Sequence, residues 1–165
     1  MTFTEDKTCC FTGHRRIPEY LHSSIRNEIV KIAKKLYLTG VDTFICGGAL
    51  GFDTIAAEAI IEAKSTYPGI RLHMAIPCPN HDKSWTERDR RKFSVLLAHA
   101  DSACYVSPTY TRYCMFTRNR YMVDNSAYCI SYCTKKTGGT CYTAGYASKK
   151  GKIVIELSDI MKLDC

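Results

Sequence analysis

Short apolar runs rich in β-branched and aromatic residues alternate with longer segments of helical periodicity along this chain. The runs that predict strands are 7–12, 43–46, 70–76, 103–107, 127–132 and 153–157. Apolar residues recur every three or four positions between them, which predicts helices over 21–38, 52–64 and 140–149, one or two helices within 80–98, and a loop then a helix over 113–124. Near-continuous apolar strands separated by helices indicate a three-layer α/β fold with a mainly parallel sheet of about six strands.

Length and composition fit one globular domain spanning residues 1–165. Hydrophobic residues make up 45% of the chain and charged residues 24%, which is too apolar for a disordered protein. No apolar run approaches the roughly 18–20 residues that cross a bilayer. The segment MTFTEDKTCC lacks the pattern of a signal peptide. We therefore expect a cytoplasmic protein with no membrane partner.

The net charge and the cysteines of the chain indicate which kinds of ligand and metal it is expected to bind. Lys plus Arg is 23 and Asp plus Glu is 16, and the surplus of +7 favours an anionic partner. Without a secretory signal, the ten cysteines are expected to be reduced thiols. Cys78 and His81 come nearest to a metal pair, but no second pair at zinc-like spacing follows. We expect no metal and no cofactor.

Small and polar residues gather where three predicted strands end. In parallel sheets ligands bind at the carboxyl ends of the strands, so these segments are candidate ligand sites. The residues are Thr12, Gly13, His14 and Arg15 after the first strand, Gly47, Gly48, Gly51 and Asp53 after the second, and Gly138, Gly139 and Thr140 after the fifth. Glycines before a helix leave backbone N–H groups free for an anion. Tight turns and a helix N-cap at Asp53 are the structural alternatives.

The segment RNRYMVDNS adds Arg118, Arg120 and Asp124, which suit a phosphate and a ribose hydroxyl or form a solvated helix surface. No motif of a serine hydrolase, P-loop or zinc protease is present. Trp85, the only tryptophan, either stacks on a base over the pocket or covers the core, and we favour the core.

The segments CFTGHR, GGALGFD, RNRYMVDNS and GGTCYTAGYA, in this order, resemble the SLOG superfamily, and most closely its YpsA-like branch. The LOG phosphoribohydrolases and the DNA-processing protein DprA are more distant relatives. The resemblance implies a Rossmann-like fold that binds a nucleotide or a nucleotide-derived small molecule between the first-strand loop and the Gly-rich loops. It also leaves a homo-oligomer open.

One departure bears on catalysis. LOG enzymes carry a PGGxGTxxE motif whose glutamate acts on the glycosidic bond, and here Thr143 stands at that position. A threonine supplies no carboxylate for an oxocarbenium-like centre. The resemblance therefore favours a sensor, regulator or ligand-sequestering module. The first alternative is a hydrolase of an N-glycosidic bond with Asp53 or Glu58 as the working carboxylate. The second is single-stranded DNA binding in the manner of DprA, since nucleic acid also suits the charge.

Overall fold

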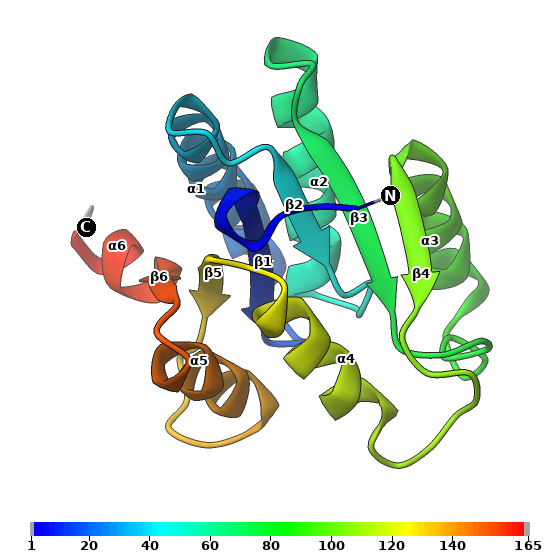
Figure 1. The fold of residues 1–165 in the computed structure, drawn as a ribbon. Coiled ribbons are helices and arrows are strands. Elements are labelled where there is room, and N and C mark those ends of the chain that lie inside the picture. The colour runs from blue at the N-terminus through cyan, green and yellow to red at the C-terminus, as the bar shows by residue number, and fades with distance from the viewer. Residues whose placement is uncertain (1, 164–165) are drawn as a thin grey trace.

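The computed structural model describes residues 2–163 of the chain and contains one six-stranded sheet. The strands are β1 (Thr8–Gly13), β2 (Thr43–Cys46), β3 (Arg71–Ile76), β4 (Ser102–Tyr105), β5 (Tyr128–Tyr132) and β6 (Ile153–Glu156). Their order across the sheet is β4-β3-β2-β1-β5-β6, and every neighbouring pair is parallel (Figure 1). The predicted α/β, Rossmann-like architecture is confirmed.

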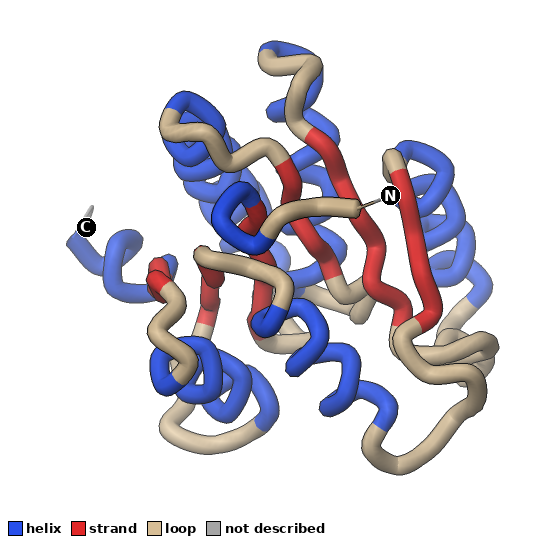
Figure 2. The backbone as a smooth tube through the Cα atoms, in the orientation of Figure 1, coloured by secondary structure: helices blue, strands red, loops and turns tan. Residues whose placement is uncertain are grey.

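Helices cover both faces of this sheet. They are α1 (Glu19–Leu38), α2 (Phe52–Thr66), α3 (Glu87–His99), α4 (Cys114–Asp124), α5 (Gly139–Lys149) and α6 (Leu157–Leu163), and a short 3₁₀ turn, η1 (Glu5–Lys7), precedes β1. Figures 1 and 2 show α1, α2 and α3 behind the sheet and α4 and α5 in front of it, with the strands pointing downwards. The loops at the carboxyl ends of the strands therefore share the lower edge of the molecule.

The core is divided by the sheet into two layers. The larger layer, on the side of α1 and α2, centres on Phe11, Phe44 and Phe52, whose side chains are fully buried. The smaller layer, under α4 and α5, contains Cys10 and Met122. Successive residues of β1 thus point to opposite faces, as expected of a strand that is buried on both sides.

One helix lies where one or two were expected, and one further helix was not expected. Residues 80–86 form turns, and the single helix of this region starts at Glu87 because the side chain of Thr86 accepts a hydrogen bond from the Asp89 N–H (3.1 Å) and caps it. Helix α6 was missed, since it follows β6 directly and no turn residues separate the two. None of the helices within residues 2–163 combines the length and the apolar character that a membrane span needs.

The sheet order fixes where a ligand site belongs. Chain order runs outward from β1 in one direction through β2, β3 and β4, and in the other direction through β5 and β6. The connections after β1 and β5, which are neighbours in the sheet, therefore diverge to opposite faces. A crevice opens at such a switch point in doubly wound sheets.

Candidate functional site

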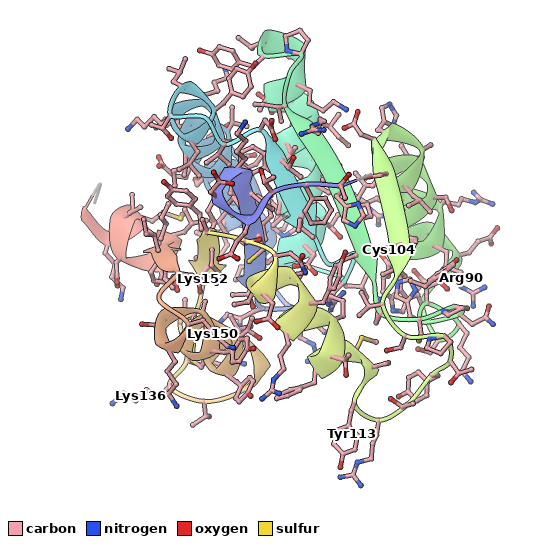
Figure 3. All side chains as sticks on the ribbon, in the orientation of Figure 1. Arg90, Cys104, Tyr113, Lys136, Lys150 and Lys152 are labelled. Atoms are coloured by element: carbon pink, nitrogen blue, oxygen red, sulfur yellow. A yellow bond between two sulfur atoms is a disulfide. The ribbon has the colours of Figure 1, made fainter. Side chains whose placement is uncertain are left out.

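A cavity of about 360 Å³ lies at the carboxyl end of β1, and we call it the site cavity. Four segments line it. The lining residues are Phe11, Thr12, Gly13, His14 and Arg15 from β1 and its loop, Ala49 and Asp53 at the start of α2, Arg112, Met115, Phe116, Arg118, Asn119 and Met122 from α4 and the loop before it, and Gly139 and Thr140 from α5. Figure 3 shows Tyr113, at the tip of the loop before α4, and Lys136, in the loop before α5, on this same lower edge.

Arg118 is the most deeply placed charge of the site, with 3% of its surface exposed. Its guanidinium Nη1 donates a hydrogen bond to the carbonyl oxygen of Gly47, and its Nε donates to Oδ1 of Asn119 (2.9 Å). A Cβ on Gly47 would lie 2.6 Å from Nη1 of Arg118. Glycine at position 47 therefore admits the arginine. Burial lowers the pKa of Arg118, and the nearby Asp53 carboxylate opposes that shift.

Asp53 is the one carboxylate among the described residues that line the site cavity. It is buried in the first turn of α2, and its Oδ2 accepts a hydrogen bond from the N–H of Ala49 (3.1 Å). Burial raises the pKa of Asp53, although the charge of Arg118, the hydrogen bond from Ala49 and the charge of Arg15 each act to lower it. Asp53 is not the N-cap of α2, because Gly51 holds that position.

Arg15 is held at the mouth of the cavity by contacts between two loops. The N–H of Phe52 donates to the carbonyl of His14 (3.0 Å), and Gly51 adopts a φ of +78°. A Cβ on Gly51 would stand 2.3 Å from the carbonyl oxygen of Arg15. The loops after β1 and β2 therefore pack backbone against backbone, and the exposed side chain of Arg15 projects from this fixed base.

The start of α5 forms another wall of the site cavity. The N-cap, Gly138, has a φ of +110° and contributes no side-chain capping bond, so the first N–H groups of the helix have no side-chain cap. His14 ties this loop to β1, because its Nε2 accepts a hydrogen bond from the N–H of Thr134 (2.9 Å). Burial and the charge of Lys135 lower the pKa of His14, in keeping with a neutral, accepting ring.

A disulfide between Cys133 and Cys141 closes the same loop. The expectation that all ten cysteines are free thiols was therefore wrong for this pair. The two Cα atoms lie 6.0 Å apart, because the chain turns back from the end of β5 into the first turn of α5. Four of the strand cysteines, Cys9, Cys10, Cys46 and Cys129, are free and buried, as predicted.

Thr143, which stands where LOG enzymes carry their glutamate, is buried, and its hydroxyl has two hydrogen-bond partners. Its hydroxyl donates to the carbonyl of Gly139 (2.9 Å) and accepts from the side-chain amide of Asn119 (3.2 Å). The residue thus joins the first turn of α5 to α4 and contributes no charge to the cavity.

Several residues singled out from the sequence lie elsewhere. Glu58 is on the side of α2 that faces α3, where its carboxylate pairs with Lys92 (3.1 Å). Arg120 and Asp124 are exposed on the outer side of α4, where Arg120 donates to the hydroxyl of Tyr142 (2.8 Å) and Asp124 accepts from that of Tyr146 (2.8 Å). Gly48 has a φ of +71° and packs near Phe93, outside the site cavity.

The structure also adds site residues that sequence reasoning missed, chiefly Arg112, Met115, Phe116 and Asn119. A usable signal was present for Met115, since it lies three residues before Arg118 and residues at that spacing share a helix face. No comparable signal existed for Arg112, which precedes α4 in a loop.

The sequence of the chain matches a known protein family. The YpsA model, described as the YspA SLOG family, matches residues 7–158. The chain belongs to this family. All the segments that carry the resemblance noted above, and all the residues of the site cavity, fall inside the matched range.

The chain is similar to a UPF0398 protein of Halalkalibacterium halodurans, which is 27% identical over 147 residues that cover 85% of this chain and 74% of the relative. The UPF0398 protein YpsA of Bacillus subtilis is 25% identical over 134 residues, covering 79% of this chain and 72% of that protein.

Solved structures of DNA processing protein A share the fold of this SLOG chain. The protein from Streptococcus pneumoniae superposes with a TM-score of 0.68 at 17% identity, covering 92% of this chain and 50% of that one. The protein from Helicobacter pylori, whose structure was determined for its single-stranded DNA binding mode, gives a TM-score of 0.62 at 21% identity over 92% of this chain and 65% of that one. The present chain thus spans half to two thirds of these proteins.

Proposed function

We propose that this chain binds a nucleotide-derived anion in the site cavity and acts as a sensor, regulator or sequestering module without turning the ligand over. The observation that carries the proposal is the charge around the cavity. Three arginines, Arg15, Arg112 and Arg118, line it together with the single carboxylate of Asp53. Guanidinium groups bind phosphate through paired N–H donors, so a phosphorylated ligand suits this lining.

The start of α5 supports the same ligand. Gly139 and Thr140 line the cavity, and a Cβ at Gly139 would meet no atom within 4 Å. The backbone there is open to close approach, and the N–H groups and the dipole of a helix N-terminus attract an anion. A phosphate between this helix start and Arg15 would be held from both sides of the switch point.

The positions of the carboxylates favour binding without turnover, because two of the three candidate positions supply no carboxylate to the site cavity. The LOG position is occupied by Thr143, whose hydroxyl already has two hydrogen-bond partners. Glu58 is paired with Lys92 and does not line the cavity. Asp53 remains as the carboxylate of the hydrolase alternative, and the test below separates the two functions.

The test is a thermal-shift screen of the purified protein against nucleotides, dinucleotides and ADP-ribose-type compounds, with mass spectrometry of each hit. A ligand at about a hundred times its dissociation constant adds about 2.7 kcal/mol of stability. Recovery of the intact compound supports a binding module. Recovery of free base and sugar phosphate refutes it and assigns Asp53 a catalytic part, which Asp53→Asn then checks.

Two variants test the site itself. Arg15→Gln and Arg112→Gln each remove one exposed charge from the cavity lining. Because hydrogen bonds to charged groups contribute about 1.5–3 kcal/mol, each should weaken binding about tenfold or more in calorimetry. Arg120→Gln is the matched control, since it removes the same charge from the outer side of α4. Equal losses in all three would contradict the proposed site.

Single-stranded DNA binding is the second candidate. Its support is the fold shared with DNA processing protein A and the fact that Arg15 lines two further cavities beside the site cavity, so that the cavities adjoin along the edge of the sheet. DNA contacts to several phosphates give an affinity that falls steeply with salt. Tight oligonucleotide binding with such a slope, and no thermal shift by any small nucleotide, would favour this candidate.

A further inference from the structure

Trp85 lies in the wall of a large cavity that the proposed function leaves unused. This cavity, of about 610 Å³, is on the α1, α2 and α3 side of the loop that follows β1, and we call it the Trp85 cavity. Its lining residues are Arg15, Arg16, Ile17, Pro18, His22, Leu50, Gly51, Thr54, Ile55, Trp85, Asp89, Lys92 and Phe93. The loop before α3 and α3 itself, which carries the labelled Arg90, can be followed in Figure 3.

The indole is fixed by its aromatic neighbours. Trp85 meets the ring of His81 edge to face at 5.2 Å and that of Phe93 at 5.9 Å, and His81 and Phe93 are themselves 5.1 Å apart. Yet the residue is only half-buried, and it lines a second, smaller cavity as well. The predicted core role of Trp85 therefore accounts for only part of the side chain, because another part of the ring borders two cavities. A rigid, partly exposed aromatic ring is a suitable stacking surface for a planar group.

The smaller cavity, of about 150 Å³, links this indole to the proposed ligand site. It shares Arg15 and Trp85 with the Trp85 cavity. With the site cavity it shares Arg15, Ala49, Met115 and Arg118. Arg15 thus lines all three cavities, and an anion held at Arg15 has room for a substituent on either side.

The charge of the Trp85 cavity suits the same kind of ligand. Arg15 and Arg16 line it together with Lys92, which is paired with Glu58, and with one carboxylate, that of Asp89. Positive charge beside an aromatic wall is the combination by which proteins hold a phosphate and stack the base attached to it.

We propose that the Trp85 cavity is a base-binding subsite for the second half of a two-part nucleotide, whose phosphates lie at Arg15 and whose first half occupies the site cavity. The chemical class is therefore a dinucleotide or a similar ligand with a heterocyclic base beyond its phosphates. This inference rests on the proposed function, because it needs a ligand in the site cavity.

The test uses tryptophan fluorescence, excited at the long-wavelength edge where tyrosine does not absorb, and this emission reports Trp85 because no other tryptophan is present. The probes are adenosine and guanosine monophosphate and the matching dinucleoside diphosphates, with affinities measured in parallel by calorimetry. We expect a dinucleoside diphosphate to quench the emission and to bind about tenfold more tightly than its mononucleotide, the gain that one stacked base provides. The mononucleotide should bind without quenching.

A pair of variants assigns the gain to the indole. Trp85→Ala should remove the tenfold advantage of the dinucleoside diphosphate and leave mononucleotide affinity unchanged, whereas Trp85→Phe should retain most of the advantage. Tyr105→Ala, which shortens an exposed aromatic side chain on β4, is the control and should change neither affinity. Unchanged mononucleotide binding also shows that a variant is folded.

Three results would overturn the subsite. Equal affinities for the two ligand sizes, with no change in emission, would leave the site cavity as the whole binding site and the proposed function intact. Quenching by the mononucleotide as strong as that by the larger ligand would place a single base on Trp85 and refute the two-part ligand. Absence of binding by all four probes would refute the proposed function and the subsite together.

Discussion

Reduction of the Cys133–Cys141 disulfide should lower the stability of the protein by an amount that follows from the loop it closes. The two cysteines are eight residues apart in the sequence. The chain-entropy treatment of cross-links assigns a loop of this length about 2.5 kcal/mol at 25 °C. With an unfolding entropy of about 2.1 cal/mol/K per residue, a chain of 165 residues should then melt about 7 °C lower when the bond is reduced.

The assay compares melting of the oxidised protein with and without a phosphine reductant. The bond can be mapped independently, because Lys135 and Lys136 lie between the two cysteines. Trypsin cuts there, so a bridged pair yields two peptides joined through sulfur, and reduction separates them. Cys133→Ser/Cys141→Ser is the control, and it should melt at the temperature of the reduced wild type whether or not reductant is present.

The reasoning is refuted if the mapped disulfide is intact and yet its reduction leaves the melting temperature unchanged. It is also refuted if the double variant is as stable as the oxidised protein. Loss of stability on reduction that persists in the double variant would assign the effect to other cysteines. Cys78 and Cys114 are one such pair, since their sulfur atoms are 3.7 Å apart.

Three further outcomes are expected. Gly13→Ala should lower the free energy of unfolding by about 1–3 kcal/mol in urea titrations, because a Cβ there would lie 2.1 Å from the fully buried ring of Phe52. Gly145→Ala, at an open position inside α5, should instead raise it by about 0.5–1 kcal/mol. The pKa of His14 is lowered in the folded state, so the unfolded chain binds the proton more readily, and stability should fall as the pH drops below the unfolded value of about 6.5. His14→Gln, which can still accept from Thr134, should flatten that fall in urea melts taken between pH 7.5 and 5.5 (roughly the span over which histidine titrates), and an unchanged slope would contradict the assignment.

The fold was predictable because the four central strands, β1, β2, β3 and β5, are covered by helices on both faces and therefore read as nearly continuous apolar runs. Residues 43–46 illustrate this, since all four are buried and the predicted and observed strand coincide. Boundaries were less predictable where a side chain sets them. The start of α3 depends on the hydroxyl of Thr86, and the sequence offers two equivalent start signals, because Ser84 and Thr86 are each followed three positions later by an acidic residue.

The part of the site that was predictable from the sequence is the part formed by residues at the ends of strands. Thr12, Arg15, Asp53 and Thr140 meet because parallel strands bring their carboxyl ends to one edge. Which side of a helix a residue occupies depends on the packing of that helix. Arg118 and Arg120 are two residues apart on α4, yet one is buried against Gly47 and the other is exposed.

Two of the glycines at the strand ends have a different structural role from the one predicted. The sequence suggested that they bring backbone close to a ligand, but the space beside Gly13 and Gly47 is filled by the chain itself, by Phe52 and Arg118 respectively. Gly139, by contrast, has no atom within 4 Å of where its Cβ would stand. Gly47 therefore makes room for an arginine of the cavity wall and Gly13 makes room for Phe52, whereas the start of α5 is where backbone itself is open to a bound anion. A ligand that contacts this chain through main-chain N–H groups should consequently be more sensitive to Gly139→Val, which fills open space at the helix start, than to the loss of any single exposed arginine.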